Sequence, residues 1–198
     1  ESHPVHKSLM EFARLVEEKT DGSIRVQLYP NGRVGSEREA IELTQTGAVD
    51  IAKVSASALE SFSDVYSIFS LPYLFDNKEH YYRVMNSNIA QDIYGSTDKM
   101  GFIGLTYYDS GVRNFYTKDK PIMHPDDLKG LKIRVQPSDT AIEMIKLMGG
   151  APTPMSFGEV YTAMQQGVID GSENNETALT DNNHGEVAKQ YSYSEHAI

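Results

Sequence analysis

The sequence predicts an α/β protein in which helices alternate with strands along the chain. Amphipathic helical patterns are separated by short apolar runs of period two, an order typical of parallel strands joined through helices. Two capping boxes, Ser36 to Glu39 and Ser156 to Glu159, mark helix starts. Residues 44–51 and 163–171 share one plan of helix end, glycine, short strand and aspartate. This repeated pattern indicates either two lobes built on the same plan or a common helix-to-strand junction that recurs by chance.

The first 110 residues are predicted to hold a succession of helices and strands. We expect helices over 5–20, 36–46, 76–85 and 89–99, and strands over 24–29, 50–55 and 101–107. A parallel sheet of this kind normally begins on a strand, so we expect a missing strand before Glu1. The break at residues 109–111 indicates that the chain crosses here into a second lobe.

The second half is predicted to repeat the alternation in shorter elements. We expect strands over 112–116, 131–135, 168–171 and 187–193, and helices within 121–130, over 139–148 and 156–166, and up to residue 180. Residues 172–175 are predicted to form a polar loop. The expected domains are a partial lobe I over 1–110, lobe II over 111–194, and the start of a return crossing over 195–198.

Arg134 stands near the end of a predicted strand, because Leu131, Ile133 and Val135 alternate with Lys132 and Arg134. Ser138 can cap the next helix. Ligands bind at this edge of open α/β sheets, and a guanidinium beside free helix N–H groups suits a carboxylate. The alternative, which the pattern alone favours, is a surface arginine in a structural ion pair.

Composition excludes several classes of function. The formal net charge of −10 argues against nucleic acid and anionic membrane as partners. The chain has no cysteine, so disulfides, zinc–thiolate sites and cysteine nucleophiles are excluded. It has no apolar run long enough for a transmembrane helix. No phosphate-binding loop, dinucleotide-binding motif or nucleophile elbow is present, and we expect no catalytic residue, metal or cofactor.

The remaining candidates are polar or aromatic groups at predicted strand ends and helix starts. Arginine binds carboxylates, asparagine offers a donor and an acceptor, and an aromatic ring suits the apolar face of a sugar. Taken singly, each of these residues is more often structural. The candidates are Ser55, Arg113, Arg134, Phe157 and Asn174.

Several ordered motifs resemble the solute-binding proteins of tripartite ATP-independent periplasmic (TRAP) transporters, in the dicarboxylate-binding-protein family. They are Tyr29-Pro30-Asn31-Gly32, Leu71-Pro72-Tyr73-Leu74-Phe75, Gly111-Val112-Arg113-Asn114-Phe115, Asp126-Asp127-Leu128-Lys129-Gly130-Leu131-Lys132-Ile133-Arg134-Val135, the run from Gly150 to Tyr161, and the run from Gln166 to Asn174. The resemblance implies a two-lobed Venus-flytrap fold with mixed sheets flanked by helices, here lacking the first strand and the C-terminal portion.

The resemblance also implies roles for six ligand-binding residues. Arg134 matches the arginine that clamps the substrate carboxylate, and Asn174 the asparagine that steadies it. Arg113 matches a second cleft arginine and Phe157 an aromatic wall. Glu37 and Ser55 match residues that touch the far end of the ligand.

We therefore expect a monomeric extracytoplasmic binding protein that hands an organic acid to a membrane-embedded TRAP permease. The expected ligand is a hexuronate such as glucuronate or galacturonate, or a related sugar acid. The expected location is the periplasm, or the cell exterior with a lipid anchor where the source has no outer membrane.

Three alternatives remain open. A four-carbon dicarboxylate would need a second cation, which Arg33, Arg38 or Lys53 could supply. An enzyme on the same frame could use Glu173 or Asp170 as a base. The chain could also be the ligand-sensing domain of a signalling system.

Overall fold

The computed structural model describes residues 3–198. The second half of the chain forms a mixed five-stranded sheet. The spatial order is β3-β2-β4-β1-β5. β2 runs parallel to β3 and β4, whereas β1 runs antiparallel to β4 and β5. The strands are β1 (Arg113–Thr117), β2 (Lys132–Val135), β3 (Ala151–Pro154), β4 (Gly171–Asn174) and β5 (Gln190–Ala197).

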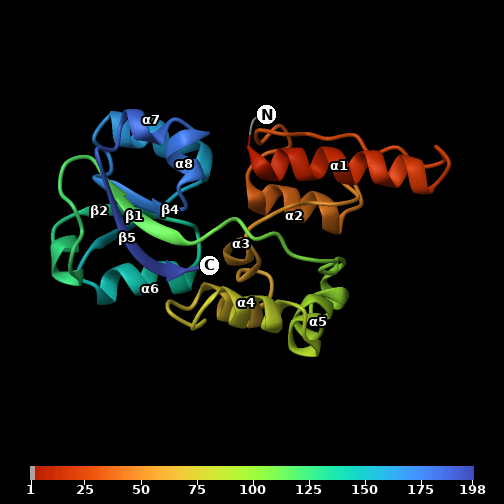
Figure 1. Ribbon diagram of the computed structural model, residues 1–198, viewed down its shortest axis with the longest axis horizontal. Coiled ribbons are helices and arrows are strands. Elements are labelled where there is room, and N and C mark those ends of the chain that lie inside the picture. Colours follow the sequence, from red (N-terminus) through yellow and green to blue (C-terminus); the bar gives the residue numbers. More distant parts are fainter. Residues whose placement is uncertain (1–2) are drawn as a thin grey trace.

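Helices cover both faces of this sheet, with α6 (Asp139–Leu147) on one face and α7 (Val160–Gln165) and α8 (Thr177–Thr180) on the other (Figure 1). The alternation of strand side chains builds two cores. Phe115 faces α6 and packs with Ile133 and Ile145, whereas the neighbouring Tyr116 faces α7 and packs with Met164.

The first half of the chain is helical and lies beside the sheet (Figure 1). Its core is an aromatic cluster of Tyr81, Met85, Ala90 and Tyr94, and Ile198 from the far end of the chain packs against it. The helices are α1 (Pro4–Lys19), α2 (Glu37–Gln45), α3 (Ala56–Leu59), α4 (Lys78–Met85) and α5 (Asn88–Gly95). None of the helices within residues 3–198 is both long and apolar enough to cross a membrane.

The α/β class and the main helices are confirmed. Helices occupy the predicted positions after Pro4, after Ser36 and after Ser138, and the capping box at Ser36 forms, with Glu39 accepting from the Ser36 backbone at 2.7 Å.

The three strands predicted in the first half are wrong. Residues 24–29, 50–55 and 101–107 are not hydrogen-bonded into any sheet of the described chain. A strand needs a neighbour for its backbone groups, and alternation in the sequence does not supply one. Apolar side chains of these segments, such as Ile24, Ile51 and Leu105, accordingly stay about half exposed or more.

The predicted polar loop at 172–175 is wrong for most of its length, because β4 runs from Gly171 to Asn174 in the middle of the sheet. Gly171 makes this close packing possible, since a Cβ there would lie 2.6 Å from the Tyr116 carbonyl oxygen. Ser172 and Glu173 are buried between the neighbouring strands. The last strand, β5, also runs further than the predicted residue 193.

Candidate functional site

Arg134 is a buried arginine without a carboxylate partner in the described part of the chain. It is 2% exposed, and its Nε and Nη2 atoms donate to the Met155 carbonyl at 3.0 and 2.9 Å. Its Nη1 atom is buried and has no hydrogen-bond partner among residues 3–198. Burial lowers the pKa of Arg134; the negative charge of Glu173 opposes this, and the positive charge of Arg113 adds to it. The alternative of a surface arginine in an ion pair is therefore wrong.

Strand register explains why Arg134 faces the α7 side of the sheet. Its neighbours Ile133 and Val135 pack in the core under α6, so the alternate residue between them points the other way. Arg134 pairs with Ser172 of β4 in the parallel ladder. The carboxyl ends of β2 and β4 and the start of β1 share one edge of the sheet, which brings Arg134, Asn174 and Arg113 to the same end.

Arg113 differs from Arg134 because it is neutralised. Its Nη2 and Nε donate to the two oxygens of Glu173 at 2.7 and 2.5 Å, a bidentate ion pair. Burial alone would raise the pKa of Glu173, but Arg113 and His196 outweigh it and bring the pKa to about 2. The Nε2 atom of His196 lies 3.5 Å from Glu173 Oε2.

Asn174 lies next to Arg113 at the end of β4. Its side-chain oxygen accepts from the Asn175 backbone at 2.9 Å and lies 3.5 Å from Nη1 of Arg113. No hydrogen bond to its amide nitrogen occurs in the described chain, so this nitrogen remains available as a donor.

Phe157 begins a 3₁₀ turn (Phe157–Glu159), and its ring centroid lies 5.8 Å from Cζ of Arg134. Its other neighbour is the ring of His184 at 5.1 Å, and His184 Nδ1 in turn lies 2.8 Å from the Tyr116 hydroxyl. Burial lowers the pKa of His184 to about 4, with a further contribution from the charge of Arg134. The Phe157 ring thus lies beside the Arg134 guanidinium, and the neutral imidazole of His184 packs against that ring.

Glu37 and Ser55, which are 18 residues apart in the sequence, are in direct contact. The backbone N–H of Ser55 donates to Glu37 Oε1 at 2.8 Å, and its hydroxyl donates to Oε2 at 2.5 Å. Burial lowers the pKa of Arg134, and the negative charges of Glu173 and, to a smaller extent, Glu37 oppose this. Glu37 therefore lies within electrostatic reach of the arginine from the helical half of the chain.

The helix N–H groups expected to be free beside Arg134 are partly occupied. At the N-terminus of α6, Ser138 Oγ accepts from the backbone N–H of Ala141 at 3.1 Å and donates to Glu60 at 2.9 Å. Glu60 comes from the helical half, 78 residues earlier in the chain. That part of the prediction is wrong, because a carboxylate of the protein itself lies at this helix end.

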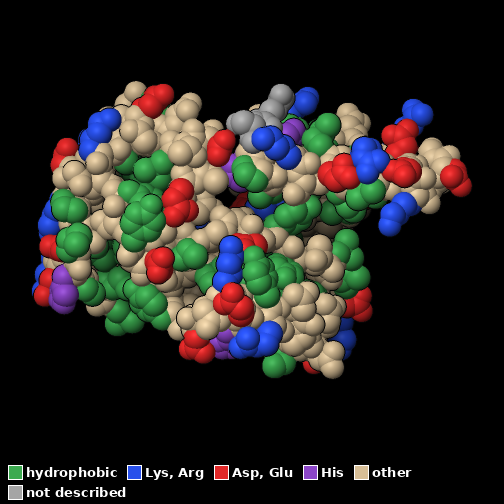
Figure 2. Space-filling model, viewed as in Figure 1, with side chains coloured by type: hydrophobic (Ala, Val, Ile, Leu, Met, Phe, Trp, Pro, Cys, Tyr) green, Lys and Arg blue, Asp and Glu red, His purple; other side chains and the backbone are tan. Residues whose placement is uncertain are grey.

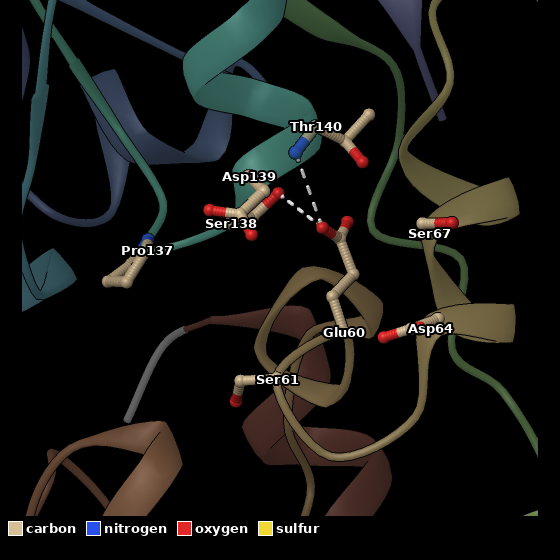
Figure 3. A pocket seen from close by; sticks show the side chains of 8 residues that line it. All are labelled: Glu60, Ser61, Asp64, Ser67, Pro137, Ser138, Asp139 and Thr140. Carbon is tan, nitrogen blue, oxygen red and sulfur yellow. Dashed lines mark hydrogen bonds between the residues drawn. The ribbon is translucent and has the colours of Figure 1, made fainter.

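A separate pocket of about 390 Å³ opens beside Glu60, between α3 and the N-terminus of α6 (Figure 3). Carboxylates and hydroxyls line it, and none of the six predicted ligand residues does. The three carboxylates would repel an organic acid, so this pocket does not have the chemistry of a carboxylate site. Its lining comprises Glu60, Ser61, Asp64, Ser67, Pro137, Ser138, Asp139 and Thr140.

Sequence reasoning missed the buried partners of the site, namely Glu173 as the counter-ion of Arg113, together with His184, His196 and Glu60. The sequence pattern indicates Glu173 only as a possible base in a loop. The pairing of β1 with β4 places Glu173 beside Arg113, and no local pattern in the sequence indicates that pairing.

The surface provides no continuous basic area on the face shown in Figure 2, where acidic and basic side chains are interspersed. Along α1, for example, Arg14 pairs with Glu11 and Glu18. Within residues 3–198 no group of three or more His, Asp and Glu side chains is arranged to hold a metal ion.

A buried arginine with an unpartnered donor at the carboxyl edge of an α/β sheet has the chemistry to bind an anion, here with an aromatic ring beside it. Comparison with known proteins agrees with this class. The model of the bacterial extracellular solute-binding proteins, family 7 (DctP), matches residues 1–198. The chain belongs to this family.

Three similar proteins illustrate the family. The uncharacterised protein YiiZ of Salmonella typhimurium is 55% identical over 196 residues, which are 98% of this chain and 60% of YiiZ. A TRAP solute-binding protein of Anaerococcus prevotii with bound D-glucuronate is 51% identical, with a TM-score of 0.97 over 99% of this chain and 64% of that one. The corresponding protein of Xanthobacter autotrophicus, with bound β-D-galacturonate, is 38% identical, with a TM-score of 0.95 over 100% of this chain and 66% of that one. The chain thus spans about 50–60% of the length of the curated relatives it matches.

Proposed function

We propose that the protein captures a hexuronate, glucuronate or galacturonate, or a related sugar acid, and delivers it to a TRAP permease. The observation that carries the proposal is the buried Nη1 atom of Arg134, which has no partner in the described chain. A buried cation left unpaired is strongly unfavourable, so a ligand carboxylate supplies what the fold leaves out. The bound uronates of two similar proteins support this choice of acid.

The other predicted residues complete the site in this proposal. Asn174 donates its free amide N–H to the carboxylate, and Phe157 packs against the apolar face of the sugar ring. Glu37 and Ser55, which already bind each other, accept and donate to hydroxyls at the far end. Arg113 is held by Glu173, so it contributes mainly positive potential and its Nη1 N–H rather than a second clamp.

The two halves of the chain act as lobes, with lobe I over 1–110, lobe II over 111–194 and the return crossing beginning at 195–198. They close about hinges near 108–111 and 193–198. Left-handed backbone conformations in these segments support this assignment, at Gly111 (φ 90°) and Glu195 (φ 47°). Closure excludes water and strengthens the contact of Arg134 with the carboxylate.

Membership of the family supports a setting outside the cytoplasm with a membrane-embedded permease as partner. We further propose that the protein works there as a monomer. The ligand is bound and released unchanged, so no residue has a catalytic role.

A ligand panel tests the proposal on the full-length protein. D-Glucuronate, D-galacturonate, D-gluconate and succinate are compared by thermal shift and then by calorimetry. The uronates should raise the melting temperature most, because ligand that binds only the folded state stabilises it by mass action. Recovered ligand should be chemically unchanged, and a chemically altered ligand would support the enzyme alternative.

Arg134→Ala provides the matched loss of function. It should weaken uronate binding by about 3–5 kcal/mol while the protein remains folded, because the carboxylate loses its buried counter-charge. Arg25→Ala is the control, since Arg25 is exposed and its ion pair within residues 3–198 is with Glu17. Near-wild-type affinity in Arg134→Ala would rule out the site.

A further inference from the structure

Glu60 connects two segments that are far apart in the sequence. It follows directly on α3, is 9% exposed, and its Oε2 atom accepts from Ser138 Oγ at 2.9 Å. The backbone N–H of Thr140 lies 3.5 Å from the same oxygen. In Figure 3 the side chain of Glu60 reaches from the helical half toward the first turn of α6.

The two segments are those that carry opposite walls of the proposed site. Ser55, which binds Glu37, is the N-cap residue of α3, and Glu60 is five residues further along the chain. Arg134 lies on β2, and Ser138 follows four residues later. A hydrogen bond between Glu60 and Ser138 therefore fixes the wall that bears Ser55 relative to the wall that bears Arg134.

The environment of Glu60 shows which property of the side chain is used. No lysine or arginine lines the adjoining pocket, whose other ionisable groups are Asp64 and Asp139. Only one carboxylate oxygen is engaged, since Oε1 is buried and has no partner in the described chain. The contact thus depends on an acceptor aimed at Ser138 and the start of α6, a role that a glutamine can also fill.

We propose that Glu60 is a positioning residue for the carboxylate site, holding the Ser55 wall against the Arg134 wall through Ser138. The identity of the ligand in this inference rests on the proposed function, whereas the contact between Glu60 and Ser138 rests on the geometry alone. When the contact is lost, the walls separate more readily and a bound acid escapes faster.

Binding kinetics of D-glucuronate to the full-length protein test the proposal. Glu60→Ala should weaken binding about tenfold, almost entirely through faster dissociation. Glu60→Gln should restore most of the affinity, because it keeps the acceptor. Ser138→Ala should weaken binding similarly, and the double variant should be no weaker than the worse single variant. Additive losses, or no loss in Glu60→Ala, would overturn the proposal.

Asp64→Ala is the matched control, because Asp64 lines the same pocket but makes no hydrogen bond to α6 in the described chain. It should leave affinity and dissociation unchanged. A decrease equal to that of Glu60→Ala would show that the charge of the pocket matters rather than the contact, and would also overturn the proposal.

A second measurement needs no ligand identity. These 198 residues contain no cysteine, so labels at Glu42→Cys on α2 and Glu143→Cys on α6 report the separation of the two halves. Glu60→Ala should reduce the population with the short distance, with and without sugar acid, whereas Asp64→Ala should not. An unchanged population would overturn the role of Glu60. If the wild type bound no uronate, the proposed function would be wrong. The distance between the two labels would still test the contact between Glu60 and Ser138.

Discussion

Arg134 and Arg113 lie at the same end of the sheet, and among residues 3–198 a carboxylate pairs with Arg113 but not with Arg134. Arg134 is in register with Ser172 of β4, whereas the Arg113 side chain binds the neighbouring Glu173. The fold thus neutralises one arginine and leaves the other with an open donor. Arg113 therefore has a structural role, whereas Arg134 has the proposed binding role. Variants at the two positions can test these roles separately.

Replacing Arg134 with methionine should stabilise the ligand-free protein. The change removes a buried charge without a carboxylate partner and keeps the volume, and such exchanges are neutral or stabilising by about 1–4 kcal/mol. The free energy of unfolding in urea measures this, with the exposed Arg25→Met as control. A clear loss of stability in Arg134→Met would show that the hydrogen bonds to Met155 outweigh the cost of the buried charge.

Glu173→Gln should destabilise the protein at neutral pH by about 3–5 kcal/mol, since it leaves Arg113 without its counter-ion. The pKa of Glu173 is lowered from 4.5 to about 2 in the folded state. Its stabilisation is therefore complete above pH 4.5 and is lost as pH falls through about 2.

Unfolding at several pH values measures the contribution of Glu173. The difference in stability between the wild type and Glu173→Gln should shrink from pH 4.5 downward, while the exposed Glu143→Gln should follow the wild type. A difference that stays constant across this range would contradict the assigned ion pair.

His184→Gln should flatten the pH dependence of stability between pH 6.5 and 4. Burial and the charge of Arg134 lower the pKa of His184 from 6.5 to about 4. Within this window His184 is protonated in the unfolded chain but neutral in the folded chain. The free energy of unfolding therefore falls as pH drops from 6.5 to 4, by at most about 3 kcal/mol. Thermal unfolding across the window checks this, with the exposed His124→Gln as control. Equal slopes in the wild type and His184→Gln would contradict it.

Gly171→Ala should destabilise the sheet by about 1–3 kcal/mol, because the new methyl group would lie 2.6 Å from the Tyr116 carbonyl and 2.7 Å from Thr117 Cγ2. Gly158→Ala is the matched control, since a methyl group added there would have no neighbouring atom within 4 Å. Chemical denaturation should separate the two variants clearly, and equal stabilities would argue against the close packing of β4 on β1.

Local patterns predicted the parts of the fold that depend on neighbours in the sequence. Ser36 and Ser138 begin helices because their side chains cap the first turn, and the alternation around Arg134 places it on a strand with Ile133 and Val135 buried. The edge of the sheet at which Arg134 lies also follows from the strand–helix order.

The remaining features depend on contacts between distant residues, which no local pattern reveals. The polar run around Glu173 resembles a loop, yet it is a central strand because Arg113, 60 residues earlier, satisfies the carboxylate. In the same way Glu60 reaches the start of α6 from 78 residues away. The segments around Ile24 and Leu105 show the converse case, in which a strand-like pattern has no partner in the described chain.

The pairing of β2 between β3 and β4 also limits how the protein can change over evolutionary time. A strand shifted by one residue exchanges its two faces completely. One residue inserted in the turn at Gly130 would direct Arg134 into the apolar core beneath α6 and would present Ile133 to the ligand. Under the proposed function, the length of this short turn is therefore constrained by the ligand carboxylate as much as by folding.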